Sequence, residues 1–353
     1  MSQRSRAAQT RHAPIRFGGS FARGLAAVGW FVSSAGCGQA RQEVVPYTSV
    51  DQVFSEPIFR AFEEPAGIPV RAVFDTEETK STGVLNRIIA EAGAPQADVF
   101  WSGDPARAFV LVDRGLVEPY VSPNAARIPP AFRSEDGSWT GFAARARVLL
   151  VNTDRVPEAA RPRSIRDLTD PRWRGQAAIA NPLFGTTTMH AAALFSVWGE
   201  DAAKAFFDAL KENDVRIASS NGEVKRLVVS GEVAFGLTDT DDAYGAVQEG
   251  APVMIVYPDR DDLGTLVMPT VAVLIKGAPH PEAARRLIDH LLSPSTEERL
   301  IELGAHIPLG AANGDAAVLP GLDEMRAMTV DYAQVAQEMQ RIEPWLREWV
   351  GVR

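Results

Sequence analysis

Short apolar runs alternate along the chain with longer stretches in which apolar side chains recur three or four positions apart. The short runs favour β-strands, and the longer spacing favours amphipathic helices. The predicted strands cover residues 44–47, 68–74, 97–101, 146–152, 176–180, 215–218, 233–237 and 270–275. The predicted helices cover residues 52–63, 82–92, 105–113, 164–168, 189–198, 199–211, 223–230, 243–249, 281–292, 295–303 and 322–350. Because strands and helices alternate, we expect βαβ units around a parallel sheet, which is an α/β fold.

A polar segment separates these elements into two blocks. Residues 121–138 are rich in proline, serine and aspartate and predict a linker, after which the α/β alternation resumes over residues 146–260. The chain has 353 residues, and domains usually contain about 100–200 residues. The length therefore allows two or three domains.

The first 36 residues have the features of a secretory signal. They contain five arginines and no acid, and residues 24–32 form an apolar run that is too short to span a bilayer core of about 30 Å. The residues Ser33-Ser34-Ala35-Gly36 precede Cys37 and resemble a bacterial lipobox, in which the cysteine is lipidated. We expect a signal peptide over 1–36 and a lipoprotein tether over 37–43. The alternative is a signal cleaved nearby, with Cys37 free.

The charge and the cysteine content exclude several classes of protein. There are 36 Lys and Arg against 45 Asp and Glu, which gives a net charge of −9. Phosphate recognition needs a basic face, so we expect no nucleic-acid partner. The single cysteine excludes a disulfide scaffold, a four-cysteine zinc site and a CxxC redox motif.

Polar turns follow several of the predicted strands. In open α/β sheets, ligands bind beyond the carboxyl ends of the strands, and helix N-termini offer hydroxyl and N–H groups to an anion. The candidate anion cradle comprises Thr48, Ser49, Gly185, Thr186, Thr187 and Thr188. Asn221-Gly222 lies on another such turn. The alternative is that each serine or threonine only caps its own helix.

Four acids lie on the same kind of turn, namely Asp51, Asp104, Asp241 and Asp242. Together they could hold a hard cation through oxygen ligands, with Tyr47 or Tyr244 as additional donors. A cationic organic ligand is equally compatible. The alternative is again that each carboxylate caps a helix.

Motifs for catalysis are missing. The chain has no GxSxG, HExxH or P-loop motif, and none of its five histidines pair at metal-ligand spacing. His190 follows the threonine-rich turn and is interpreted as a packed helix residue; the alternative is that it faces the cleft. We therefore expect no enzyme activity.

The chain resembles the solute-binding proteins of bacterial ABC importers, of the type II periplasmic-binding fold, and is most similar to the ferric-iron-binding group. The resemblance covers residues 44–310. The segments that carry it are Val45-Pro46-Tyr47-Thr48-Ser49, 97–101, 114–120, 146–152, 180–188 and 277–292. It implies two α/β lobes around a hinged ligand cleft. Lobe 1 would comprise 44–145 and 270–353, with part of the C-terminal helices free to pack on lobe 2, and lobe 2 would comprise 146–269. The crossing strands would lie near 145–150 and 268–273.

The resemblance also implies a ligand set. The ferric group takes ligands from the first turn, from the Asp-Val-Phe turn and from a pair of adjacent tyrosines. In this sequence Asp51 and Asp104 fall on the first two turns, and the tyrosine pair falls near Asp241-Asp242, with Tyr244 close by. Carboxylates would therefore replace phenolates. The expected metal ligands are Asp51, Asp241, Asp242 and Tyr244. The other expected ligand-binding residues are Tyr47, Thr48, Ser49, Asp104, Gly185, Thr186, Thr187 and Asn221.

The resemblance then implies a function. We expect a monomeric lipoprotein, in the periplasm or on the outer face of the cell membrane, whose membrane contact is the lipid on Cys37. It would capture ferric iron with a synergistic anion and deliver it to an ABC permease in the inner membrane. Fe³⁺ would be a transported ligand, and no cofactor is required. The alternatives are a phosphonate, sugar phosphate, thiamine or polyamine as ligand, or a ligand-sensing module for a membrane receptor.

Overall fold

The computed structural model describes residues 43–75, 83–303, 307–310, 322 and 325–351. The predictions for the signal peptide and for Cys37 lie outside the described residues, and the predicted tether does so up to residue 42.

Ten strands form one mixed sheet in the described part of the chain. Eight strands follow the order β2-β1-β3-β10-β5-β8-β6-β7, while β4 pairs with β10 and β9 pairs with β5. The strands are β1 (Pro46–Thr48), β2 (Val73–Phe74), β3 (Val99–Ser102), β4 (Val117–Glu118), β5 (Thr140–Asn152), β6 (Ala177–Ala180), β7 (Arg216–Ala218), β8 (Phe235–Asp239), β9 (Val253–Val256) and β10 (Val267–Ile275).

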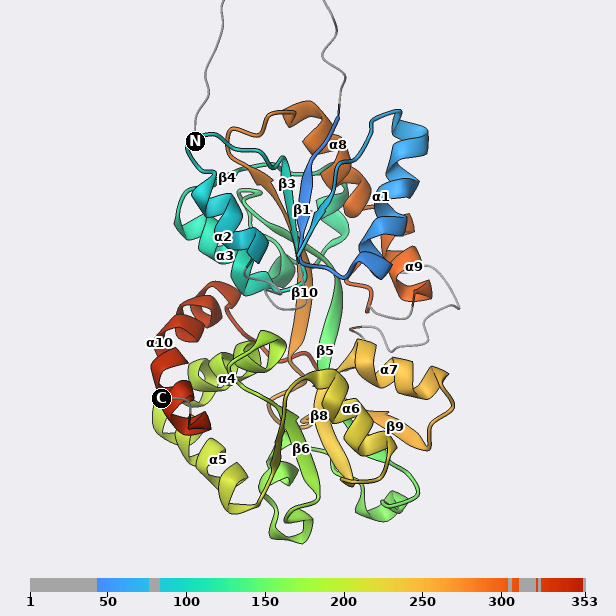
Figure 1. The fold of residues 1–353 in the computed structure, drawn as a ribbon, viewed down its shortest axis with the longest axis vertical. Helices are drawn as coiled ribbons and strands as arrows, with labels where there is room; N and C mark the ends of the chain where they lie inside the picture. The colour runs from blue at the N-terminus through green and yellow to red at the C-terminus, as the bar shows by residue number, and fades with distance from the viewer. Residues whose placement is uncertain (1–42, 76–82, 304–306, 311–321, 323–324, 352–353) are drawn as a thin grey trace, which may run out of the picture. The chain divides into compact units, whose positions relative to one another are not determined.

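The sheet contains two parallel groups joined by two long strands. Strand β1 is parallel to β2 and β3, and β6 is parallel to β7 and β8. Strands β5 and β10 are antiparallel to each other and run from one group to the other (Figure 1). The expected parallel strands are present in both groups, but the strands predicted over 146–152 and 270–275 are antiparallel to their neighbours, so the sheet is mixed rather than parallel.

The helices are divided between the same two groups (Figure 1). Helices α1, α2, α3, α8 and α9 accompany β1–β4, and α4–α7 accompany β6–β9. Helix α10 packs against both α3 and α4. The helices are α1 (Gln52–Ala66), α2 (Gly83–Ala90), α3 (Pro105–Asp113), α4 (Gly185–Trp198), α5 (Glu200–Glu212), α6 (Asn221–Val229), α7 (Thr240–Gln248), α8 (Pro281–Leu291), α9 (Pro294–Glu302) and α10 (Tyr332–Val350).

Several element boundaries differ from the prediction. The helix predicted over 164–168 is a short 3₁₀ turn, Ile165–Thr169, and the last helix begins at Tyr332 because Asp331 caps it there. Strands β4 and β9 were not predicted, and β5 begins at Thr140 rather than at residue 146. Pairing with distant partners, which a local pattern does not contain, extends the chain at these places.

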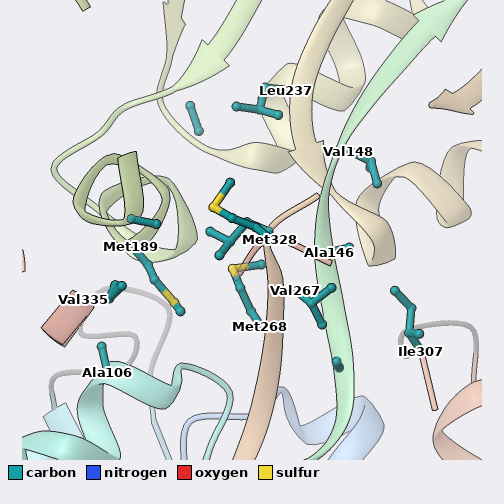
Figure 2. Close-up of a cluster of buried hydrophobic side chains, with 14 of the residues drawn as sticks. Ala106, Ala146, Val148, Met189, Leu237, Val267, Met268, Ile307, Met328 and Val335 are labelled. Atoms are coloured by element: carbon teal, nitrogen blue, oxygen red, sulfur yellow. The ribbon is translucent and has the colours of Figure 1, made fainter. Parts of the chain in front are cut away.

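The two long strands are buried. Every residue of β5 except Arg145 is buried, and so is every residue of β10. Figure 2 shows part of this core, with Ala146 and Val148 from β5, Val267 and Met268 from β10, and Met189 from α4. Val335 of α10 and Met328 belong to the same cluster. The one exception in β5, Arg145, therefore indicates where the strand meets solvent or a ligand.

Within the described residues, we find no helix with the length and apolarity that crossing a membrane requires.

Candidate functional site

The carboxyl ends of both parallel groups face the same stretch of β5. Ser102, at the end of β3, pairs with Val271 of β10, and Val271 in turn pairs with Gly141 of β5. Asp239, at the end of β8, pairs with Arg147 of β5. The predicted polar turns follow these strand ends. Ligands of open α/β sheets bind at such places, so residues 141–147 of β5 form the floor of the candidate site.

Arg145 connects the turns of the two groups. Its Nη2 donates a hydrogen bond to the carbonyl oxygen of Gly103, at 3.0 Å, in the turn after β3. Its Nη1 lies 3.2 Å from Oδ2 of Asp241 in α7 and 3.5 Å from Oδ2 of Asp239. The side chain is 20% exposed. Arg145 is thus the cation at the centre of the candidate site.

Arg147, whose side chain is fully buried, makes a second network. Its Nη1 donates to Oδ1 of Asp239 at 2.6 Å, to Oγ1 of Thr186 at 3.1 Å and to Oδ1 of Asn221 at 3.0 Å. Its Nη2 donates to Oγ1 of Thr187 at 3.3 Å. Thr186 Oγ1 in turn donates to Oδ2 of Asp239 at 2.8 Å. Such bonds offset the cost of burying both charges. The structure thus brings Thr186, Thr187 and Asn221 together, because all three bond Arg147 and Nδ2 of Asn221 also donates to Oγ1 of Thr186 at 2.9 Å.

The sequence interpretation missed Arg145, Arg147 and Asp239. A signal for the two arginines was present, because they stand two positions apart inside an apolar strand and so share one face of it. Charged side chains are rarely buried unless they are paired. The spacing therefore indicates buried acidic partners, although it does not show which acids they are.

The first group contributes tightly bonded turns. Thr48 Oγ1 donates to the carbonyl of Trp101 at 2.9 Å, and Ser49 Oγ accepts from the N–H of Gly103 at 3.1 Å. Asp104 accepts from the N–H of Ala106 at 2.9 Å and caps α3, as its alternative interpretation expects. Burial raises the pKa of Asp104, and the positive charge of Arg107 opposes that shift. These bonds hold the turns after β1 and β3 beside Gly103.

Tyr47 is not gathered with these turns. Tyr47 is buried in the core beside Val84 and Leu85, and its hydroxyl donates to Glu91 Oε2 at 3.0 Å. Successive residues of a strand point to opposite faces, so Tyr47 points away from the face that Thr48 occupies. Tyr244 is half-buried and packs against the apolar core. The structure thus separates Tyr47 from the residues with which the sequence interpretation grouped it.

Asp241 and Asp242 stand in the first turn of α7, and Asp51 precedes α1. Burial, together with the negative charges of Asp241 and Asp239, raises the pKa of Asp242 to about 7. Burial lowers the pKa of Arg145, but Asp241, Asp239 and Asp51 outweigh that effect and raise it above its usual value. Among the described residues, no three Asp, Glu, His or Cys side chains are arranged to hold a metal ion.

Three carboxylates are crowded at the candidate site. Arg147 pairs closely with Asp239, while Asp241 and Asp242 lie within the electrostatic influence of Arg145, and Asp242 also within that of Lys225. Gly185 begins α4 with φ +56°, and the preceding Phe184 is 65% exposed. Chemically, the site offers carboxylate oxygens to a cation or to hydrogen-bond donors, one guanidinium to an anion, and one aromatic ring to an apolar group.

Comparisons with known proteins agree with this architecture. The profile of the family described as bacterial extracellular solute-binding protein matches residues 94–335. Iron uptake protein A1 of Synechocystis is 28% identical over 282 residues, which are 76% of this chain and 76% of the relative. A putative 2-aminoethylphosphonate-binding periplasmic protein of Salmonella typhimurium is 26% identical over 299 residues, which are 83% of this chain and 82% of that relative.

A solved structure confirms the predicted fold. The crystal structure of iron-bound HitA from Pseudomonas aeruginosa matches with a TM-score of 0.78 at 24% identity, over 86% of this chain and 99% of that one. The two-lobed α/β architecture of periplasmic binding proteins, expected from the sequence, is therefore present.

Proposed function

Because the chain belongs to the family of bacterial extracellular solute-binding proteins, we propose that it captures a small solute outside the cytoplasm for an ABC permease. The relatives are named for uptake and binding rather than for a catalysed reaction, so the expectation that the chain is not an enzyme is confirmed. The lobe boundaries, the lipid on Cys37 and the monomeric state stay predictions.

The ligand presents both signs of charge. The crowding of Asp239, Asp241 and Asp242 carries this proposal, because like charges held together in a partly buried site are costly unless a cation joins them. A cationic centre would lie against Asp241 and Asp242 in α7. An anionic group would take the guanidinium of Arg145, whose Nη1 is now 3.2 Å from Asp241.

Ferric iron with a synergistic anion is the first candidate, since it combines a small hard cation, which prefers oxygen ligands, with an anion. The similarity to an iron uptake protein supports it. Iron would be cargo here and not a resident cofactor. The carboxylates would replace the tyrosine pair of the ferric group.

An organic solute that carries both charges is the second candidate. The guanidinium of Arg145, a good partner for a phosphonate, favours it. The similarity to a putative 2-aminoethylphosphonate-binding protein supports the same candidate. In that case the ammonium group would lie against the carboxylates of α7.

Calorimetric titration of the purified, ligand-stripped protein tests both candidates. The probes are ferric citrate, ferric chloride with phosphate, 2-aminoethylphosphonate, and ethylphosphonate, which lacks the ammonium. We expect one probe with both charges to bind at one site, and binding to be lost in Asp242→Asn and weakened in Arg145→Gln. The matched control is Asp289→Asn, a carboxylate that bonds Tyr120 and Ser122 away from the site.

Each outcome of the titration tests one part of the proposal. If ethylphosphonate binds as tightly as 2-aminoethylphosphonate, the cationic half of the proposal is wrong. If no probe binds, both candidate ligands are wrong. Uptake of the bound probe by a deletion strain then tests delivery. Unchanged uptake would contradict the importer role and would favour the ligand-sensing alternative.

A further inference from the structure

Strand β5 contains one residue that has no partner across the ladder. Pro269 of β10 pairs with Ala144, and the next residue, Thr270, pairs with Phe142. Ala143 is therefore the extra residue of a β-bulge, and its φ is +38°. A side chain makes positive φ unfavourable, so the surrounding structure has to hold this conformation.

A buried glutamate from α9 holds the bulge. The N–H of Ala143 donates to Oε1 of Glu297 at 2.8 Å, and Glu297 is only 2% exposed. The same carboxylate accepts the N–H groups of Leu309 at 2.9 Å and Gly310 at 3.2 Å, and it forms an ion pair with Arg127. One side chain thus joins the bulge to two other segments.

Neighbouring residues also hold the bulge in place. Ala144 and Ile307 form an antiparallel bridge with N–H···O distances of 2.7 Å and 2.6 Å. A Cβ on Gly310 would overlap the guanidinium of Arg127 and lie 2.9 Å from Oε2 of Glu297, so a side chain there would displace this ion pair. The bulge is therefore fixed to α9, which belongs to the first group of elements (Figure 1).

The position of the bulge connects it to ligand capture. On one side of it, Gly141 and Thr140 pair with the part of β10 that pairs with β3. On the other side, two residues away, Arg145 begins the stretch that holds Asp239 and Asp241. A change of backbone angles at Ala143 would therefore move Arg145 and the second group relative to Gly103.

We propose that Ala143 is a hinge point for lobe closure and that Glu297 is the positioning residue that sets its angle. The carboxylate satisfies the N–H that the bulge removes from the ladder, and so selects one arrangement of the two groups. The role in capture rests on the proposed function, whereas the hinge itself does not.

Distances between two spin labels, measured by double electron–electron resonance on the ligand-free full chain, test the hinge. Spin labels are placed on Glu118→Cys in β4 and Asp208→Cys in α5, both exposed, in a Cys37→Ser background. In Glu297→Gln an N–H₂ group replaces one acceptor oxygen opposite Arg127 and three N–H donors. We expect a broader distribution of label distances with a shifted mean. Ala143→Gly, which tolerates many more backbone angles, is expected to broaden the distribution while the melting temperature changes little.

Asp289→Asn is the matched control, because it also removes a carboxylate from the first group but touches neither the bulge nor β5. We expect its distance distribution to equal that of the parent protein. Equal broadening in the control, or an unchanged distribution in Ala143→Gly, overturns the hinge. If Glu297→Gln does not fold, Ala143→Gly decides alone. Titration of the variants with ferric citrate and 2-aminoethylphosphonate separates the hinge from the proposed function. The label distances test the hinge even if neither probe binds.

Discussion

Nη1 of Arg147 and Oδ1 of Asp239 are 2.6 Å apart, and the two side chains are 0% and 2% exposed. The pair joins the middle of β5 to the end of β8. Through Thr186 and Asn221 it also fixes the turns that follow β6 and β7. An ion pair buried in this way is costly to break, because the remaining charge has no water to solvate it. The pair therefore helps to hold the carboxyl-terminal edge of the second group together.

Breaking this pair is expected to be severely destabilising. Arg147→Met or Asp239→Asn alone should lower the free energy of unfolding by about 3–5 kcal/mol, because each leaves a buried partner unpaired. The double variant Arg147→Met/Asp239→Leu should lose less than the two single losses added together. Urea denaturation followed by circular dichroism measures all three. As a control, Arg216→Met removes a pair with Glu232 in which both side chains are about half exposed, and should cost much less.

Asp242 should make the protein less stable at higher pH. Burial and two nearby carboxylates raise its pKa from 3.8 to about 7, so the native state favours the protonated form. The stabilisation that protonated Asp242 gives the folded state is complete below the pKa of this residue in the unfolded chain. It is lost as the pH rises through about 7. Asp242→Asn should therefore be more stable than the parent at pH 8, by at least about 1 kcal/mol.

At pH 4 the stabilities of Asp242→Asn and the parent should converge. Melting temperatures between pH 4 and pH 8 test this, and Asp261→Asn, at an exposed acid, is the control that should show no such pH dependence. An equal difference in melting temperature between Asp242→Asn and the parent at pH 4 and at pH 8 would contradict the expectation.

His190 should have the opposite effect on the pH dependence. It is buried in α4, as its interpretation as a packed helix residue expects, and burial followed by the charge of Arg147 lowers its pKa from 6.5 to about 3. The contribution of neutral His190 to the free energy of unfolding is present above pH 6.5. It is lost as the pH falls, because only the unfolded chain takes up the proton. Between pH 7 and pH 5 this amounts to about 2 kcal/mol.

His190→Leu should remove that part of the acid sensitivity. Urea denaturation at pH 7 and pH 5 measures it as a smaller difference than in the parent protein. Leu194→Ala is the control, because Leu194 lines the same small cavity of about 20 Å³ but does not titrate. It should lower stability equally at both pH values. If His190→Leu loses as much stability between pH 7 and pH 5 as the parent protein does, His190 is not the source of the acid sensitivity.

Gly236 should tolerate no side chain. A Cβ there would lie 2.5 Å from Cγ1 of Val224 in α6 and 3.0 Å from the carbonyl of Ala178 in β6. Gly236→Ala should therefore cost about 1–3 kcal/mol through overpacking. Thermal unfolding measures the loss. A Cβ at Gly93 would meet nothing within 4 Å, so Gly93→Ala should change stability little. Equal effects of the two substitutions would show that α6 moves away from β8 without cost.

Local signals were sufficient for most elements and for the kind of turn that forms the site. Helix α3 begins at Pro105 after the cap Asp104 and ends at Asp113, as predicted, because proline and a capping carboxylate act within one turn. The alternation of strands and helices predicted the two α/β blocks. It also placed Ser49, Thr186, Asn221, Asp241 and Asp242 on turns after strands. These are properties of neighbouring residues.

The candidate site depends on contacts that no local pattern contains. Arg147 and Asp239 are 92 positions apart, and Arg145 and Gly103 are 42 apart. Which acid neutralises which arginine is decided by the register of β5 with β8 and β10. The same register decides that Ala143 bulges and that Glu297, 154 positions away, has to satisfy its N–H. It is also tertiary packing that buries Tyr47 under α2.

The sequence by itself therefore determined an acidic α/β protein of two blocks with polar turns after its strands, because periodicity, capping and composition are local or additive. Only the tertiary structure decided that Arg145 stands between the two groups and that the threonine hydroxyls bind Arg147. Strand register and burial are set by the whole chain, and buried charges take whichever partners that register brings within hydrogen-bonding distance.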